Sequence, residues 1–232
     1  MRVHTLKARG LRNLAPLELE AGPRFHVFSG DNGQGKTNLL EGIYVLATLR
    51  SFRTSRLTDL IGTGAPKAHI EALGEKGELS RTYEVELASH GRSVRVDGKA
   101  VRPISKYFGG FNVLLFAPED LQIPRGAPAE RRKFLDRSTF CRRSNHLVAM
   151  ADYEKVLKSR NAVLRRARDD RGSAPGALLE VYDDQLAALG AAVISERRAL
   201  LADLGEGFQE AFEQITQFHL AVVATYQPGT PL

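Results

Sequence analysis

The sequence predicts an α/β protein with a small antiparallel β lobe and a helical arm. Three observations lead to this prediction. Residues 28–46 follow the pattern of a strand end, a glycine-rich turn and an amphipathic helix. Residues 68–102 alternate between apolar and polar side chains and are broken by glycine-containing turns, which indicates antiparallel strands. From Pro128 onward, apolar residues recur at helical spacing over long stretches.

The N-terminal part of the chain predicts strands before the glycine-rich turn and a helix after it. Residues 1–9 and 14–20 alternate in polarity, and "RFHVFSG" at 24–30 is expected as a further strand that leads directly into the turn. From Lys36 the apolar side chains fall on one helical face. Gly42 within this helix costs about 1 kcal/mol relative to alanine, so we expect close packing there.

The middle of the chain predicts the small sheet and one buried strand. Asp97 and Gly98 lie between two alternating runs, and this pair favours a two-residue hairpin turn. The sheet is expected beside the glycine-rich turn. The run "FNVLLF" at 111–116 is short and continuously apolar, which is typical of a buried strand.

The later part of the chain predicts helices and a final strand. Pro128 suits the first turn of a helix, and apolar residues then recur at heptad-like spacing on both sides of a loop at 171–176. We expect a helical hairpin or a short antiparallel coiled coil, followed by a strand at 220–226. The expected parts are a head at 1–137, an arm at 138–219 and the start of a strand returning to the head at 220–232.

Composition and charge narrow the class of protein. The 232 residues are 43% hydrophobic, as in soluble globular proteins, and no apolar run is long enough to span a membrane. The N-terminus has no signal-peptide core, and a single cysteine, Cys141, excludes an internal disulfide. We therefore expect a cytoplasmic protein. The net charge of +6 favours an anionic partner, such as nucleic acid or an acidic membrane surface, and the six histidines show no metal-site spacing.

The glycine-rich turn matches the pattern G-x-x-x-x-G-K-[ST] in full. Its glycines let successive backbone amides converge on phosphate oxygens, and the following helix adds the positive end of its dipole. Lys36 can bind the β- and γ-phosphates, and the Thr37 hydroxyl can bind Mg²⁺. The predicted nucleotide-binding residues are Gly30, Asp31, Asn32, Gly33, Gln34, Gly35, Lys36 and Thr37.

A phosphate loop indicates a ligand class rather than a reaction. Hydrolysis usually also needs an acidic residue at the end of a buried strand, to hold Mg²⁺ and orient water. Glu119 and Asp120, after the run at 111–116, are the candidates for this catalytic role. Because Pro118 interrupts the segment, they are expected either as the magnesium carboxylates or in a strand-to-helix loop near the γ-phosphate.

Basic residues cluster in two places that could contact a nucleic-acid backbone. The candidates for contact with DNA are Arg50, Arg53 and Arg56 after the first helix, and Arg131, Arg132 and Lys133 in the next one. A solvated charged face is the alternative explanation. Base-specific reading is not indicated, because no recognition-helix or zinc pattern is present.

Several segments together resemble one known family. The opening "LKARGLRNL", the loop "GDNGQGKTNLLEGIYVL", "SFRTSRLTDLI" and the block "VLLFAPEDLQIPRGAPAERRKFLD" look like the RecF family of bacterial recombination-repair proteins. The match runs in order from about residue 3 to 137 and more loosely through the arm. The resemblance implies the N-terminal portion of a P-loop ATPase head of the SMC/ABC type, with the antiparallel lobe and the helical arm.

The resemblance also implies a biochemical role. It implies an ATP-dependent DNA-binding protein of recombinational repair, replication and the SOS response. Such a protein binds ATP and Mg²⁺. With ATP it forms a homodimer on double-stranded DNA or on its junction with single-stranded DNA. A membrane is not among the implied partners. With mediator partners of the RecR and RecO type it helps to load the recombinase at gapped or stalled sites.

The resemblance assigns roles to individual residues as well. It implies that Arg12 and Asn13 lie near the nucleotide, and that Glu119 and Asp120 lie in a loop that senses the γ-phosphate. The family's signature motif and acidic strand lie beyond this chain, so weak ATP hydrolysis is expected of the complete protein and not of this chain by itself.

Two other functions remain open from the residues. A P-loop kinase of a small molecule would need a mobile basic lid, for which "RRK" at 131–133 is the candidate. A fragment that binds nucleotide or DNA without hydrolysis is the other.

Overall fold

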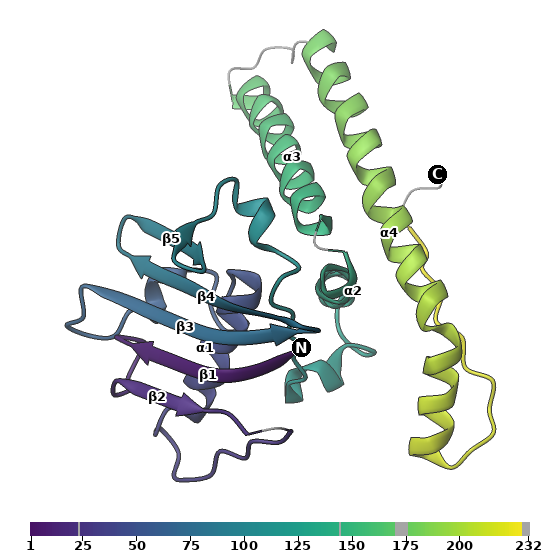
Figure 1. The fold of residues 1–232 in the computed structure, drawn as a ribbon. Helices are drawn as coiled ribbons and strands as arrows, with labels where there is room; N and C mark the ends of the chain where they lie inside the picture. Colours follow the sequence, from purple (N-terminus) through teal and green to yellow (C-terminus); the bar gives the residue numbers. More distant parts are fainter. Residues whose placement is uncertain (23, 144, 170–175, 229–232) are drawn as a thin grey trace. The chain divides into compact units, whose positions relative to one another are not determined.

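A six-stranded sheet organises the first part of the chain, in the order β2-β1-β3-β4-β5-β6 with every neighbouring pair antiparallel (Figure 1). The structure is a computed structural model and describes residues 1–22, 24–143, 145–169 and 176–228. The chain divides into two compact units, Met1–Phe116 and Ala117–Leu232. The predicted boundary at 137/138 lies within a helix of the second unit.

The strands and helices agree with most of the predicted elements. The strands are β1 Arg2–Arg9, β2 Leu17–Glu20, β3 Lys67–Lys76, β4 Leu79–Ala88, β5 Gly91–Val96 and β6 Lys99–Ala100. The helices are α1 Lys36–Thr48, α2 Pro128–Arg142, α3 His146–Asp169 and α4 Gly176–Thr216, with 3-10 turns η1 Leu57–Leu60, η2 Ile104–Tyr107 and η3 Pro118–Gln122. None of the helices in these described ranges combines the length and apolar character needed to cross a membrane.

One face of the sheet forms the core of the first unit together with α1. Period-two alternation places apolar side chains of β1, β3 and β4 on this face, and α1 packs against β3 and β4. Gly42 allows the close approach that its position predicted, because a Cβ there would lie 2.9 Å from Leu11 Cδ2. The Tyr107 hydroxyl donates to the Leu46 carbonyl oxygen at 2.6 Å and joins η2 to α1.

The hairpin prediction is confirmed at Asp97 and Gly98, which connect β5 and β6. Both residues have positive φ, 51° and 73°. A type I′ turn requires this left-handed backbone at both central positions, and Asp-Gly adopts it at low cost.

Three predicted strands are wrong in the described structure. Residues 24–30, 111–116 and 220–226 were expected as strands, but each is irregular. Phe25 and Val27 are each 89% exposed, and Phe116 is 75% exposed. The physical reason is that a strand forms only where a neighbouring backbone completes its ladder, and the described sheet includes none of these three as a strand.

Side chains rather than a sheet hold the segment that follows α4. The Gln209 amide donates to the Leu220 carbonyl at 2.9 Å, and its oxygen accepts from the Val222 amide at 2.7 Å. The predicted loop at 171–176 falls almost entirely outside the described residues, and α4 begins at Gly176.

A salt-bridged group joins the elements of the second unit. The Arg197 guanidinium donates to both Asp136 oxygens, at 2.7 and 2.8 Å, and to the Tyr226 hydroxyl at 2.9 Å. The buried His146 ring lies 3.0 Å from Asp136 Oδ1 through its Nε2. These contacts connect α2, α3, α4 and the segment after α4.

Candidate nucleotide-binding site

The phosphate loop leads directly into α1, as its motif predicts. Gly33 and Gly35 have φ of 85° and 95°, a left-handed backbone that favours glycine. A Cβ at Gly35 would overlap the Leu14 side chain, so the loop also packs closely on residues before it. Gly35 is the N-cap of α1 and has no side chain that could accept from the amides of the first turn.

Lys36 and Thr37 lie at the start of α1, with different surroundings. The Lys36 ammonium donates to the carbonyl oxygens of Gly30 and Asp31, both at 2.7 Å. Thr37 is exposed, as are Asp31 and Gln34. The glycine-rich loop, the lysine beside it and the exposed Thr37 hydroxyl fit a nucleoside triphosphate with Mg²⁺.

Asn13 lies beside the phosphate loop, as the resemblance implies. Its Nδ2 donates to the Gly33 carbonyl at 2.6 Å, and its Oδ1 accepts from Asn38 Nδ2 at 2.6 Å. Arg12 instead turns toward α1. It has a positive φ of 49° and donates to Glu41 from Nε at 2.7 Å and from Nη2 at 2.9 Å.

Glu41 is a residue of this region that the sequence prediction missed. It is fully buried within α1, accepts from Arg12 and from the Ser51 hydroxyl, and lies 3.6 Å from Arg53. Burial by itself raises the pKa of this carboxyl, but the hydrogen bonds from Arg12 and Ser51 and the nearby cations hold it below its ordinary value. The available signal was a carboxylate within the apolar face of a predicted helix.

The three arginines after α1 are exposed but are not equivalent. Arg53 donates from Nη1 to Asn38 Oδ1 at 2.8 Å, so it is held against the helix that begins at the phosphate loop. Arg50 and Arg56 are exposed on the same segment. The structure therefore brings Arg53 into the hydrogen-bonded group of Asn13 and Asn38.

The remaining predicted residues belong to the second unit. Arg131, Arg132 and Lys133 are exposed in the first turns of α2, where Lys133 pairs with Glu130 at 2.8 Å. The Glu119 side chain lies outside the described part of the structure. The phosphate loop belongs to the first unit.

Asp120 is held inside its own turn. It accepts from Arg137 at 2.7 Å and from the Ala117 amide at 2.9 Å. Burial alone raises the pKa of this carboxyl, but the bonds from Arg137 and Ala117 hold it below its ordinary value. The strand expected at 111–116, before Glu119 and Asp120, is not formed. Through its bonds to Ala117 and Arg137, Asp120 shapes the start of η3.

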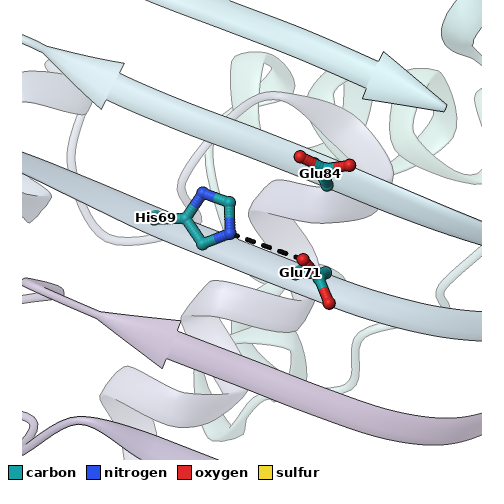
Figure 2. A group of neighbouring side chains, drawn as sticks. All are labelled: His69, Glu71 and Glu84. Atoms are coloured by element: carbon teal, nitrogen blue, oxygen red, sulfur yellow. Dashed lines mark ion pairs between the residues drawn. The ribbon is translucent and has the colours of Figure 1, made fainter. Parts of the chain in front are cut away.

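A separate group of His69, Glu71 and Glu84 lies on the sheet face away from the core (Figure 2). His69 Nε2 is 3.7 Å from Glu71 Oε2, and Glu71 pairs directly with Glu84 across β3 and β4. Lys7 is the cross-strand neighbour of Glu71, and Arg95 Nη1 lies 3.8 Å from Glu84. Cations on β1 and β5, the strands that flank β3 and β4, thus offset the two carboxylates, and the sheet face does not require a bound ion.

Comparison with known proteins identifies relatives of the whole chain. No family model matches it. It is 38% identical over 216 residues to the DNA replication and repair protein RecF of Geobacter sp. (strain M21), and 37% identical over 229 residues to that of Myxococcus xanthus (strain DK1622). The two alignments cover 93% and 99% of this chain but 57% and 59% of the relatives, so the chain spans less than two thirds of their length.

Two solved structures have the same fold. They are described as the recombination mediator protein RecF in the RecFOR pathway, one as RecF-ATP and one as RecF-ATPrS. Their TM-scores are 0.84 and 0.86, with 28% sequence identity, over 93% of this chain and 58% of theirs. Because sequence and fold agree along nearly the whole chain, it belongs to the RecF family over the part of those proteins that it matches.

Proposed function

We propose that this chain forms the ATP-binding part of a DNA-binding protein that acts in recombinational DNA repair and replication in the cytoplasm. The observation that carries the proposal is the complete phosphate loop at the start of α1, within a fold that matches RecF-ATP. The residues proposed to hold ATP are those from Gly30 to Thr37, with Asn13 beside them.

Each part of the loop has a proposed task. Lys36 moves from its carbonyl partners to the β- and γ-phosphates, and the exposed Thr37 hydroxyl binds Mg²⁺. The open first turn of α1 adds backbone amides and the positive end of the helix dipole. When bound, the metal would neutralise phosphate charge.

The complete protein is proposed to form a homodimer with ATP on DNA and to help partners load the recombinase at gapped or stalled sites. The relatives' names support the link to DNA replication and repair, and the net charge of +6 supports contact with a polyanion. The exposed residues Arg50, Arg53 and Arg56, together with Arg131 to Lys133, remain the proposed contacts to the DNA backbone. Mediators of the RecR and RecO type are the proposed partners, and weak ATP hydrolysis belongs to the complete protein.

Lys36→Met tests the nucleotide site. Because this change removes a charge-assisted contact to phosphate, we expect the affinity for a fluorescent ATP analogue to fall by at least about tenfold. Titration by fluorescence anisotropy measures it. Lys99→Met is the matched control, since Lys99 is exposed on β6 and should leave the affinity unchanged. Equal affinity of the Lys36 variant and the unchanged chain would refute the proposed site.

A further inference from the structure

Two asparagines connect the phosphate loop to the body of the first unit. Asn13 donates to the Gly33 carbonyl at 2.6 Å, and Asn38 donates to Asn13 at 2.6 Å. Arg53 then donates to the Asn38 oxygen at 2.8 Å. The chain of bonds therefore runs from the segment after α1, across the first turn of the helix, to a carbonyl inside the loop.

The buried Glu41 anchors both ends of this chain of bonds. Arg12, next to Asn13, donates to it twice, and Ser51, near Arg53, also donates to it. Ser51 in turn accepts from the backbone amides of Arg53 and Thr54, at 2.9 and 3.0 Å. Because Glu41 and Asn38 lie on the same helix, the two segments are held at a set distance from the loop.

Gly33 is the part of the loop that most needs such support. Its φ is 85°, and no atom lies within 4 Å of the position that a Cβ would occupy. A glycine in open space has little resistance to rotation of its peptide groups. A rotation that turned the Gly33 carbonyl toward the bound phosphates would place an acceptor oxygen against negative charge.

We propose that Asn13 and Asn38 are positioning residues of the phosphate loop, which keep the Gly33 carbonyl turned away from the nucleotide. Asn13 makes the bond to the carbonyl, and Asn38 orients the Asn13 amide with its nitrogen toward Gly33. The proposal rests on the proposed ATP-binding function and deepens it. It requires no contact between either asparagine and the nucleotide.

A double-mutant cycle tests the pair. Asn13→Ala and Asn38→Ala should each weaken binding of the fluorescent ATP analogue by about threefold to tenfold, the effect of losing one hydrogen bond. Both asparagines act through the same carbonyl. The double variant should therefore bind the analogue no more weakly than the single variant with the lower affinity. Additive losses, or unchanged affinity in both single variants, would overturn the proposal.

Backbone amide exchange separates positioning from a general loss of structure. In Asn38→Ala, the amides of Gly33 and Gly35 should exchange faster, while those of Val45 and Leu46 in the core should not change. Faster exchange throughout α1 would mean that Asn38 only stabilises the helix, and the proposal would be wrong. Asn161→Ala, at an exposed site of α3, is the matched control and should alter none of these values.

Lys36→Met, measured in the same titration, distinguishes the two failures. If it weakens binding and the asparagine variants do not, the positioning role is wrong and the nucleotide site stands. If Lys36→Met also has no effect, the proposed function fails, and the positioning role fails with it.

Discussion

Glu41 in the first unit and Asp136 in the second are each held by an arginine through two hydrogen bonds, but they stabilise different things. Glu41 is fully buried, and its partners lead to the phosphate loop. Asp136 has a side chain that is 15% exposed, and its partners lead to α3, α4 and Tyr226. The comparison teaches that one buried ion pair supports a site, whereas the other supports the packing of helices.

Removing the Glu41 charge should have the largest effect on stability. Glu41→Gln removes the fully buried charge that pairs with Arg12, whose side chain is 22% exposed, so the first unit should lose about 3 kcal/mol of unfolding free energy. Amide exchange of residues in α1 and β3 measures it. Glu18→Gln is the control, because Glu18 pairs with Lys7 on the surface and should cost much less. Equal losses in the two variants would show that the burial of Glu41 contributes nothing.

Breaking the Asp136 group should cost less and act elsewhere. Arg197→Met leaves Asp136 with only His146 and removes the bond to Tyr226, so we expect a loss of about 2 kcal/mol in the second unit. Limited proteolysis should cut the segment after Thr216 faster, while amide exchange in the first unit stays unchanged. Arg160→Met, at the exposed pair with Asp183, is the control and should leave cleavage unaltered. Unchanged cleavage in Arg197→Met would contradict the anchoring role of Tyr226.

Acidification should weaken the contributions of Glu41 and Asp136 to stability, with a smaller effect than either substitution. Burial tends to raise the pKa of both carboxyls, but Arg12, Ser51 and Arg53 lower that of Glu41, and Arg197 and His146 lower that of Asp136. A carboxyl whose pKa is lowered on folding stabilises the protein above its ordinary pKa and loses this contribution as the pH falls toward its folded-state pKa. Each contribution should therefore be lost as the pH falls below the ordinary carboxyl pKa of its residue.

Amide exchange at successive pH values measures these losses. Protection in the first unit should decline on acidification, and Glu41→Gln should flatten that decline without changing the second unit. An equally steep decline in Glu41→Gln would show that titration of Glu41 does not contribute to it.

Local patterns predicted the elements that need only their own residues. The hairpin at Asp97 and Gly98, helix α1 from Lys36 and the start of α2 at Pro128 depend on turn chemistry and spacing within a few residues. The phosphate loop belongs to the same class, since its glycines and Lys36 are consecutive. The motif therefore predicted where the loop ends and α1 begins, while the binding role of its residues stays a prediction.

Interactions between distant segments could not be predicted in the same way. Residues 24–30, 111–116 and 220–226 have the composition of strands, but a strand is decided by a neighbour that the pattern does not identify. The partners of Glu41 lie 29 residues before it and 10 residues after it, so no local spacing points to them. Arg53 was predicted only as a DNA contact. Its bond to Asn38, which lies 15 residues earlier in the chain, could not be predicted from local spacing either.

The two bonds from Lys36 to the loop's own carbonyls make phosphate binding an exchange rather than a simple addition. A ligand displaces these carbonyls only if it interacts more strongly with the Lys36 ammonium than the carbonyl oxygens of Gly30 and Asp31 do. A phosphate oxygen carries a negative charge that a carbonyl oxygen lacks, and this charge attracts the ammonium, so a polyphosphate can displace these carbonyls. A weakly coordinating monovalent anion gains little by the same exchange. The resting lysine thus acts as a threshold that favours highly charged ligands over the ordinary salts around the protein.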